Sequence, residues 1–260
     1  MTTFALETID LCKTFGALKV VDHVSLRLPQ GARHALIGPN GAGKTTVVQL
    51  LSGVLRPDSG RILLGGIDIS ASSQQRRVKH GLVRTFQVTN LFRGLTVLEN
   101  VFLAVSERHG VSRQMITAAG KRRDLIERAE LIIEQLGLGA DRHRRISEIA
   151  YGQQRLVEIA VALSLDPKVL LLDEPAAGIP SKEVSLLLDA VERLPADIAI
   201  LMIEHDMHVV RRFASEVSVL VGGRILMSGL PQEVMASEQV RTVYLGQTGQ
   251  KRFTTAASHA

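Results

Sequence analysis

Short, continuous runs of apolar residues recur along the chain, separated by glycine-rich and polar segments. The runs VLLL at 169–172 and IAILMI at 198–203 contain no polar side chain. A strand that is buried on both faces of a parallel sheet requires such a run. A third run, ALI at 35–37, leads through a glycine-rich loop into a helix with apolar residues at 47, 48, 50 and 51. These elements predict an α/β fold built on a mixed sheet.

Other stretches predict hairpins and helices. SGRILLGGIDI at 59–69 predicts antiparallel strands with turns at Gly60 and at Gly65 and Gly66, and VSVLVGGRILMSG at 217–229 predicts a hairpin with a Gly-Gly turn. From about residue 93 to 165 the strand pattern disappears. There, one helix carries an apolar face with the spacing i, i+3, i+4, i+7, formed by Leu156, Ile159, Ala160 and Leu163. We therefore expect a helical subdomain inserted into a mixed core.

Composition narrows the class of protein. A length of 260 residues suits one large α/β domain or a core with a smaller insertion. The longest apolar runs are far shorter than the roughly 20 residues of a membrane span, and the acidic start MTTFALETIDLCKTFG does not resemble a signal peptide, so we expect a cytosolic chain. A net charge of +5 with 3% aromatic residues does not favour nucleic-acid binding. Short basic clusters, such as Arg76, Arg77 and Lys79, predict solvated helix faces or a surface for anionic lipid or a partner.

The first candidate for chemistry is the loop GPNGAGKT at 38–45, called the phosphate loop below. It matches G-x-x-x-x-G-K-[ST] between a strand and a helix. Its glycines allow successive N–H groups to point inward, and the helix amino-terminus adds a positive dipole end. Lys44 would reach the β- and γ-phosphates, and the Thr45 hydroxyl would bind Mg²⁺. The alternative is a glycine-rich turn without a ligand.

Acidic and basic side chains follow the next two apolar runs. Asp173 and Glu174 stand at the end of the run at 169–172, where open α/β sheets bind ligands. In a P-loop ATPase, Asp173 would hold Mg²⁺ through water, and Glu174 would polarise the attacking water as a general base. His205 follows the run at 198–203, where it could contact the γ-phosphate. The alternatives are a solvated strand end for the two acids and a structural role for the histidine.

Together these motifs give the chain a resemblance to the ATP-binding cassette (ABC) ATPases, over roughly residues 5–246. The matching features, in order, are the aromatic Phe15, the phosphate loop, Gln87 as the Q-loop glutamine, the signature segment IAYGQ at 149–153, the LLLDEP strand and the switch histidine His205. VRTFQ, LFRGLTVLENV, AYGQQRLVEIA and YLG look like the ATPase subunits of branched-chain and hydrophobic amino acid importers. Alone, Gln87 could equally cap a turn.

The resemblance implies roles for individual residues. Phe15 would stack on adenine, and the nucleotide would be bound by Gly38, Pro39, Asn40, Gly41, Ala42, Gly43, Lys44, Thr45 and Thr46. Mg²⁺ would be held by Thr45, Gln87 and Asp173, with Glu174, His205 and Gln87 in catalytic roles. Tyr151, Gly152 and Gln153 would contact ATP held by the opposite subunit of a dimer.

The resemblance also implies an organisation and partners. It implies an ABC ATP-binding domain at 5–247, with core and antiparallel β subdomain at 5–92 and 166–247, a helical subdomain at 93–165 and a polar tail at 248–260. A second ATP-binding subunit, two membrane permease subunits and, indirectly, an external solute-binding protein would be its partners, with the chain peripheral to the cytoplasmic face of the inner membrane. A soluble cassette ATPase acting on nucleic acid or ribosomes is the alternative, and a small-molecule kinase would leave the signature segment unexplained.

Two positions depart from the general cassette pattern. Ala150 stands where most cassettes carry a serine, whose hydroxyl would touch a γ-phosphate. One hydrogen bond to a charged group is worth about 1.5 to 3 kcal/mol, so we expect weaker closure but not an inactive protein. Pro180 stands where relatives carry Asn or Asp, and it fits the first turn of the following helix. Because proline has no N–H to donate, we expect no backbone hydrogen bond from this position across the dimer.

Overall fold

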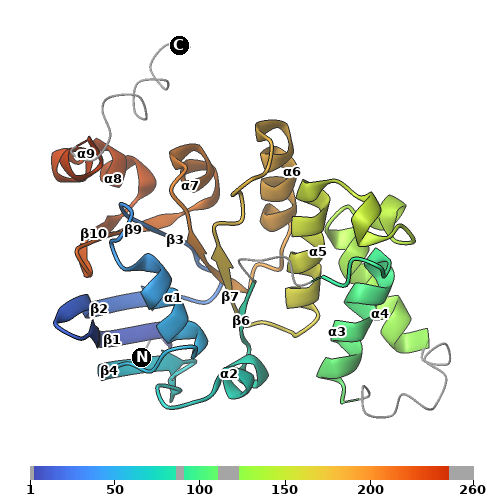
Figure 1. Ribbon diagram of the computed structural model, residues 1–260, viewed down its shortest axis with the longest axis horizontal. Coiled ribbons are helices and arrows are strands. Elements are labelled where there is room, and N and C mark those ends of the chain that lie inside the picture. The colour runs from blue at the N-terminus through green and yellow to red at the C-terminus, as the bar shows by residue number, and fades with distance from the viewer. Residues whose placement is uncertain (1–2, 86–90, 111–122, 246–260) are drawn as a thin grey trace.

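The structure is a computed structural model that describes residues 3–85, 91–110 and 123–245 (Figure 1). Its central sheet has six strands in the order β10-β9-β3-β8-β7-β6, parallel except for β10. The strands are β3 (Arg33–Ile37), β6 (Leu82–Arg84), β7 (Val169–Asp173), β8 (Ala199–Ile203), β9 (Glu216–Val221) and β10 (Arg224–Gly229). All residues of β7 and β8 are buried, as their apolar runs predicted. The β9–β10 hairpin is also confirmed.

A second, antiparallel sheet has the order β2-β1-β4-β5 and lies beside α1 (Figure 1). Its strands are β1 (Leu6–Phe15), β2 (Leu18–Leu28), β4 (Ser59–Leu64) and β5 (Ile67–Asp68). The turn predicted at Gly60 was wrong, because this residue lies inside β4. Gly60 has φ +90°, and a Cβ atom there would lie 2.4 Å from the carbonyl oxygen of Asp10. Close approach of β1, rather than a change of direction, explains the glycine.

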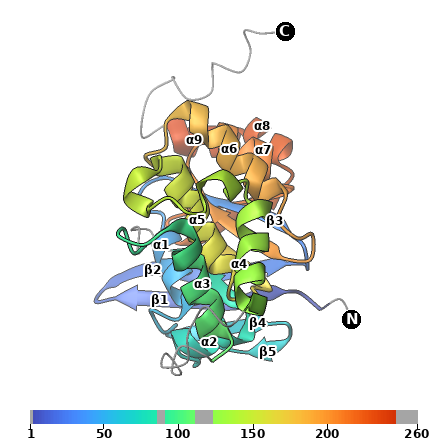
Figure 2. The ribbon, with the colours of Figure 1, turned by 90° about the vertical axis from the view of Figure 1, so that its right-hand side faces the viewer.

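Helices surround the central sheet and form a separate group at one side. Around the sheet are α1 (Lys44–Ser52), α2 (Gln74–His80), α6 (Ser181–Glu192), α7 (Met207–Phe213), α8 (Pro231–Ala236) and α9 (Glu238–Leu245). The separate group contains α3 (Val97–Arg108), α4 (Arg123–Gln135) and α5 (Tyr151–Leu163), with short 3-10 helices at Gly139–Asp141 and Ile146–Glu148. Figures 1 and 2 show this group on the side away from the antiparallel sheet. The predicted helical insertion is confirmed, while its exact limits at 93 and 165 stay a prediction.

Two apolar cores lie on opposite faces of the central sheet. One contains the inward side chains of the antiparallel sheet and α1, together with Val169, Leu171 and Leu201. The other contains Leu170 and Leu172 and the apolar faces of α3, α4, α5 and α6. The predicted face of α5, formed by Leu156, Ile159, Ala160 and Leu163, is buried there. The helical group therefore shares its core with the sheet that carries the candidate site.

One of the basic clusters differs from its prediction. Arg77 is not solvated: its side chain is fully buried, and its guanidinium donates to the carbonyls of Leu50 and Leu51 at 2.5 and 2.7 Å. It also donates to the carbonyls of Ser70 and Ser72. These bonds satisfy carbonyls at the end of α1. Burial lowers the pKa of the Arg77 guanidinium to about 10, and the charge of Asp68 partly opposes the shift.

Within residues 3–85, 91–110 and 123–245, no helix is both long enough and apolar enough to cross a lipid bilayer.

Candidate active site

The phosphate loop, Asp173, Glu174 and His205 meet at the carboxyl edge of the central sheet. Because β3, β7 and β8 are parallel neighbours, their ends face the same edge. In the register, Asp173 pairs with Ile203, and Leu36 also pairs with Ile203. The phosphate loop after β3, Glu174 after β7 and His205 after β8 therefore leave the sheet side by side. The phosphate loop and Glu174 are more than a hundred residues apart in the sequence, yet they lie at the same edge of the central sheet.

The phosphate loop is shaped by close packing of its backbone. Gly43 is the N-cap of α1 with φ +104°, and a Cβ atom there would lie 2.6 Å from the carbonyl oxygen of Val20. Only glycine fits this conformation and this space. No side chain caps the amino-terminus of α1, and its first turn contains no acidic residue. The free N–H groups and the helix dipole therefore make this end suitable for an anion.

Lys44 is a buried residue of the phosphate loop. Its Nζ donates to the carbonyl oxygens of Gly38 at 2.6 Å and Pro39 at 2.9 Å. Burial lowers the pKa of the Lys44 ammonium, while the negative charges of Glu174 and Asp173 partly oppose this shift. Lys44 is thus held in the loop, within the electrostatic reach of both acids.

Glu174 has an unusual backbone conformation. Its φ is +46°, a region that residues other than glycine rarely occupy, and its N–H donates to the carbonyl of Ile203 at 2.9 Å. Such conformations persist only where surrounding structure holds them, and they are frequent at functional sites. Oε1 of Glu174 lies 3.7 Å from Nδ1 of His205, and both side chains are partly exposed. The predicted base and the predicted switch histidine are therefore adjacent.

Asp173 forms an ion pair that the motif did not predict. Its Oδ2 accepts a hydrogen bond of 2.6 Å from Nη2 of Arg84, the last residue of β6. The Asp173 side chain is 3% exposed. The available sequence signal was an arginine ending the apolar stretch GLVR, directly before TFQ.

Glu204 is a second residue that motif analysis did not assign. It is 1% exposed, and its carboxylate accepts from the N–H groups of Ala176, His205 and Asp206. Burial raises the pKa of the Glu204 carboxyl, although the three amide donors and the charge of His205 oppose the shift. Glu204 thus ties the loop after Glu174 to the segment that carries His205. Its position directly after an apolar strand was the signal.

The signature segment, residues 149–153, lies at the amino-terminus of α5, where its polar groups bind within the same chain. The N–H of Gly152 donates to Oε2 of Glu183 at 3.0 Å. The Gln153 amide accepts from the N–H of Ala150 at 3.0 Å and donates to Asp141 at 2.5 Å. Among the described residues, no hydrogen bond or ion pair links the signature segment to the phosphate loop. One chain alone therefore does not bring these two predicted parts together.

Comparison with known proteins agrees with this architecture. A profile of the family described as ABC transporter matches residues 21–177. The chain belongs to the ABC transporter family. It is 37% identical over 244 residues to the high-affinity branched-chain amino acid transport ATP-binding protein LivG of Escherichia coli (strain K12), covering 91% of this chain and 96% of that one. It is 36% identical to the corresponding protein BraF of Pseudomonas aeruginosa, covering 93% and 98%.

Solved ABC cassettes have the same fold. The cassette MJ1267 in its ADP conformation matches with a TM-score of 0.83 and 31% identity, covering 94% of this chain and 100% of that one. A dimeric cassette, MJ0796 bound to ADP and phosphate, matches with a TM-score of 0.71 at 22% identity, which supports the fold alone. As a member of this family the chain is an ATPase, and the P-loop NTPase fold predicted from its motifs is confirmed.

The remaining residues singled out by the cassette motifs are Phe15, Tyr151, Gln87 and Pro180. Phe15 ends β1 and is 47% exposed, with Nζ of Lys13 5.7 Å from the centre of its ring. Tyr151 begins α5, and its hydroxyl accepts from Arg155 at 2.8 Å. Gln87 lies outside the described residues. Pro180 is the N-cap of α6, one residue before the predicted first turn, and its carbonyl accepts from the N–H of Glu183 at 2.8 Å.

The chain's own residues suit a nucleotide and a divalent cation. The uncapped amino-terminus of α1 and the Lys44 ammonium provide donors and positive charge for phosphates. The exposed Thr45 hydroxyl and the buried Asp173 carboxylate provide oxygen, which Mg²⁺ prefers in proteins. ATP binding is a property of this family, and the site contains the donor types that Mg²⁺ requires.

Proposed function

We propose that this cassette is the ATP-hydrolysing subunit of an importer for branched-chain or related amino acids. The observation that supports this most directly is the shared sheet edge, where Lys44, Asp173, Glu174 and His205 lie together. Relatives that match over nine-tenths of the chain are named for branched-chain amino acid transport. A relative at 34% identity is named for lipopolysaccharide export. The proposed cargo therefore follows the relatives at 37% and 36% identity, which are named for branched-chain amino acid transport.

In this proposal the phosphate loop holds the nucleotide. Backbone N–H groups from Gly38 to Thr46 surround the phosphates, Lys44 moves from the loop carbonyls to the β- and γ-phosphates, and Phe15 stacks on adenine. Mg²⁺ would be held by the side chains of Thr45 and Gln87 and by Asp173 through water. When bound, it would neutralise charge on the phosphates.

Glu174 and His205 carry the hydrolytic step in this proposal. Glu174 accepts the proton of the attacking water as a general base, and its strained backbone aims it at the edge of the sheet. His205, 3.7 Å from the Glu174 carboxylate, contacts the γ-phosphate and so senses its loss. Gln87, which lies outside the described residues, would contact Mg²⁺ and the attacking water.

The signature segment completes a second nucleotide site in this proposal. Tyr151, Gly152 and Gln153 close on the ATP held by the opposite subunit, identical or homologous, and two ATP molecules are sandwiched in the dimer. Two separate permease subunits carry the solute, and an external solute-binding protein delivers it. The ATPase subunits then lie on the cytoplasmic face of the membrane. In the same proposal the core and antiparallel β subdomain comprise residues 5–92 and 166–247, and the helical subdomain comprises residues 93–165.

The substitution Glu174→Gln tests the chemistry. It keeps the size of the side chain but removes the base, so steady ATP turnover falls at least about 100-fold, since general base catalysis contributes roughly 10²–10⁴-fold. ATP binding, measured by calorimetry, stays within about twofold. Glu192→Gln is a matched control because Glu192 is exposed and pairs with Arg212. Unchanged turnover in Glu174→Gln would show that another group is the base.

Expression with candidate permease subunits tests the transport assignment. The cassette is expected to co-purify with the permeases, and reconstituted vesicles are expected to take up leucine, isoleucine or valine in the presence of ATP and the binding protein. Export of solute, or salt-sensitive binding to DNA or RNA without a membrane partner, would contradict the assignment; the second result favours a soluble cassette.

A further inference from the structure

Arg84 connects two segments of the proposed metal site. It is the last residue of β6, the edge strand of the central sheet, and pairs with Leu171 of β7. The next residue, Thr85, donates from its N–H to the carbonyl of Leu171 at 3.0 Å. Gln87 follows three residues after Arg84 in the sequence. Arg84 is thus paired in space with the strand that ends in Asp173 and precedes Gln87 in the sequence.

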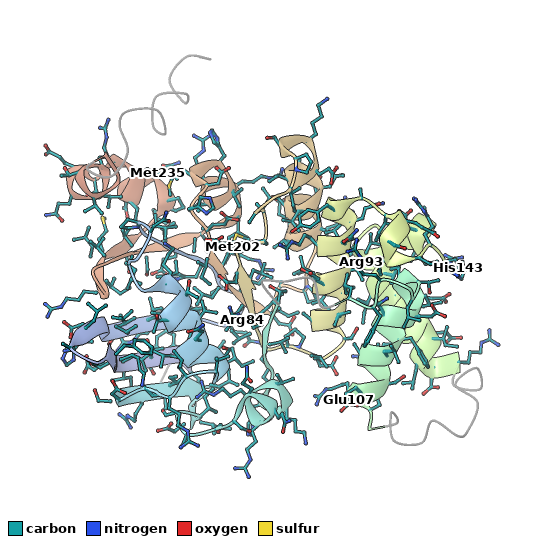
Figure 3. The ribbon with its side chains drawn as sticks, viewed as in Figure 1. Arg84, Arg93, Glu107, His143, Met202 and Met235 are labelled. Atoms are coloured by element: carbon teal, nitrogen blue, oxygen red, sulfur yellow. The ribbon has the colours of Figure 1, made fainter. Side chains whose placement is uncertain are left out.

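Strand geometry directs Arg84 and Asp173 to the same face of the sheet. Side chains alternate between the two faces of a strand. Leu82 and Leu171 belong to the core on the α1 side, so Arg84 and Asp173, each two residues further on, also face α1 and its Lys44. Figure 3 labels Arg84 near the middle of the molecule, where β6 ends. The guanidinium therefore lies beside Asp173, at the carboxyl edge of the sheet.

The ion pair satisfies a carboxylate that would otherwise be costly to bury. Asp173 and Arg84 are 3% and 18% exposed, and Nη2 lies 2.6 Å from Oδ2. A buried charge without a partner is strongly unfavourable. Lys44, a second nearby cation, donates to the carbonyls of Gly38 and Pro39. Nε of Arg84 is buried and has no acceptor among the described residues, so its pair with Asp173 also anchors the guanidinium.

We propose that Arg84 is a positioning residue for the divalent cation. This inference rests on the proposed function, in which Asp173 binds the cation through water. By holding Oδ2, Arg84 fixes the orientation of the carboxylate and leaves Oδ1 for a water of the cation. Because the carboxylate is already oriented before nucleotide arrives, no ordering of Asp173 opposes metal binding.

A thermodynamic cycle tests this positioning without using hydrolysis. The affinity of the full chain for ADP is measured by calorimetry in Mg²⁺ and in EDTA, and the ratio of the two dissociation constants is the contribution of the metal. In Arg84→Met this ratio is expected to fall about tenfold, since a hydrogen bond to a charged group is lost. Affinity for ADP in EDTA is expected to stay within about twofold. Arg84→Lys keeps the charge and is expected to recover part of the ratio, with a loss of about threefold.

The sign of the change separates positioning from simple charge repulsion. If Arg84 only repelled the cation, Arg84→Met would increase the contribution of Mg²⁺, and this result would overturn the inference, as would an unchanged ratio in both variants. Arg212→Met is the control, because Arg212, which lies on α7, also pairs with carboxylates, those of Asp189 and Glu192. Should Arg84→Met fail to fold, Arg84→Lys decides by the same ratio. A wild-type chain without any Mg²⁺ effect on ADP would contradict the proposed metal site itself.

Discussion

The backbone N–H of Gly152 donates a 3.0 Å hydrogen bond to Oε2 of Glu183, so a carboxylate of the same chain occupies the amino-terminus of α5. Glu183 lies in the first turn of α6, which follows the LLLDEP strand. In the proposed dimer, the γ-phosphate of the opposite subunit approaches this same N–H. One donor cannot serve both anions fully, and their negative charges repel. Closure of the dimer therefore requires the Glu183 carboxylate to move away.

Glu183→Gln is expected to favour the closed dimer. In a Glu174→Gln background, which prevents hydrolysis, half-maximal dimerisation should require about two- to fivefold less ATP, since repulsion of about 0.3–1 kcal/mol near a helix end is removed. Sedimentation velocity measures this. Glu192→Gln, on the same helix, should leave dimerisation unchanged. A higher ATP requirement in Glu183→Gln would instead show that Glu183 supports the closed state.

Gly152→Asp is expected to stop hydrolysis in the assembled complex by at least about 100-fold while sparing ATP binding to the isolated subunit. A Cβ atom at Gly152 would lie 2.5 Å from Oε2 of Glu183, and the new carboxylate adds negative charge where a phosphate is expected. Calorimetry on the subunit and phosphate release from the complex measure the two effects. Gly94→Asp is the control, because Gly94 has no positive φ and a Cβ atom there meets no atom within 4 Å. Equal losses of ATP binding and hydrolysis would argue for damage to the fold.

Arg77→Met is expected to lower the free energy of unfolding by about 3 kcal/mol. The substitution keeps much of the buried stem but leaves the carbonyls of Leu50 and Leu51 without their charged donor. Urea unfolding followed by circular dichroism measures the loss. The neighbouring Arg76 is exposed, so Arg76→Met should change stability by less than about 0.5 kcal/mol. Similar losses in both variants would mean that the buried hydrogen bonds of Arg77 contribute no more to the free energy of unfolding than the exposed side chain of Arg76 does.

Stability is expected to fall on acidification because of His34. This side chain is 2% exposed, with Nε2 2.9 Å from Oγ of Ser218 and Nδ1 3.6 Å from the half-exposed Glu216 carboxylate. Burial lowers the pKa of the His34 imidazole from 6.5 to about 4. Between these values the unfolded chain binds more protons than the folded one, so stability present above pH 6.5 is lost as the pH falls towards 4.

The substitution His34→Gln isolates this effect. Between pH 7 and pH 5 the wild type should lose about 2 kcal/mol more than the variant, since each unit of pKa difference corresponds to about 1.4 kcal/mol. Urea unfolding at the two pH values gives the difference, whatever the absolute cost of the substitution. Parallel losses in both proteins would mean that the His34 imidazole takes up its proton over the same pH range in the folded and the unfolded chain.

Local sequence patterns predicted two central strands and the phosphate loop of this protein. Uninterrupted apolar runs predicted β7 and β8, because a strand covered on both faces tolerates no polar side chain. The spacing of glycines, Lys44 and Thr45 predicted the phosphate loop, because these residue types serve one task within eight consecutive positions. Motif order along the chain was enough to indicate the family and the sheet edge where the site lies.

Only the tertiary structure decided which polar groups bind each other. Arg84 and Asp173 are 89 residues apart, Gly152 and Glu183 are 31 apart, and Arg77 caps a helix 26 residues before it. In the sequence these residues read as ordinary surface charges or motif members. Their roles depend on strand order and helix packing, because a charge without a partner is costly once the fold removes water from it. Pattern alone therefore predicted the nucleotide site, while long-range packing determined what holds the Asp173 carboxylate and what occupies the amino-terminus of α5.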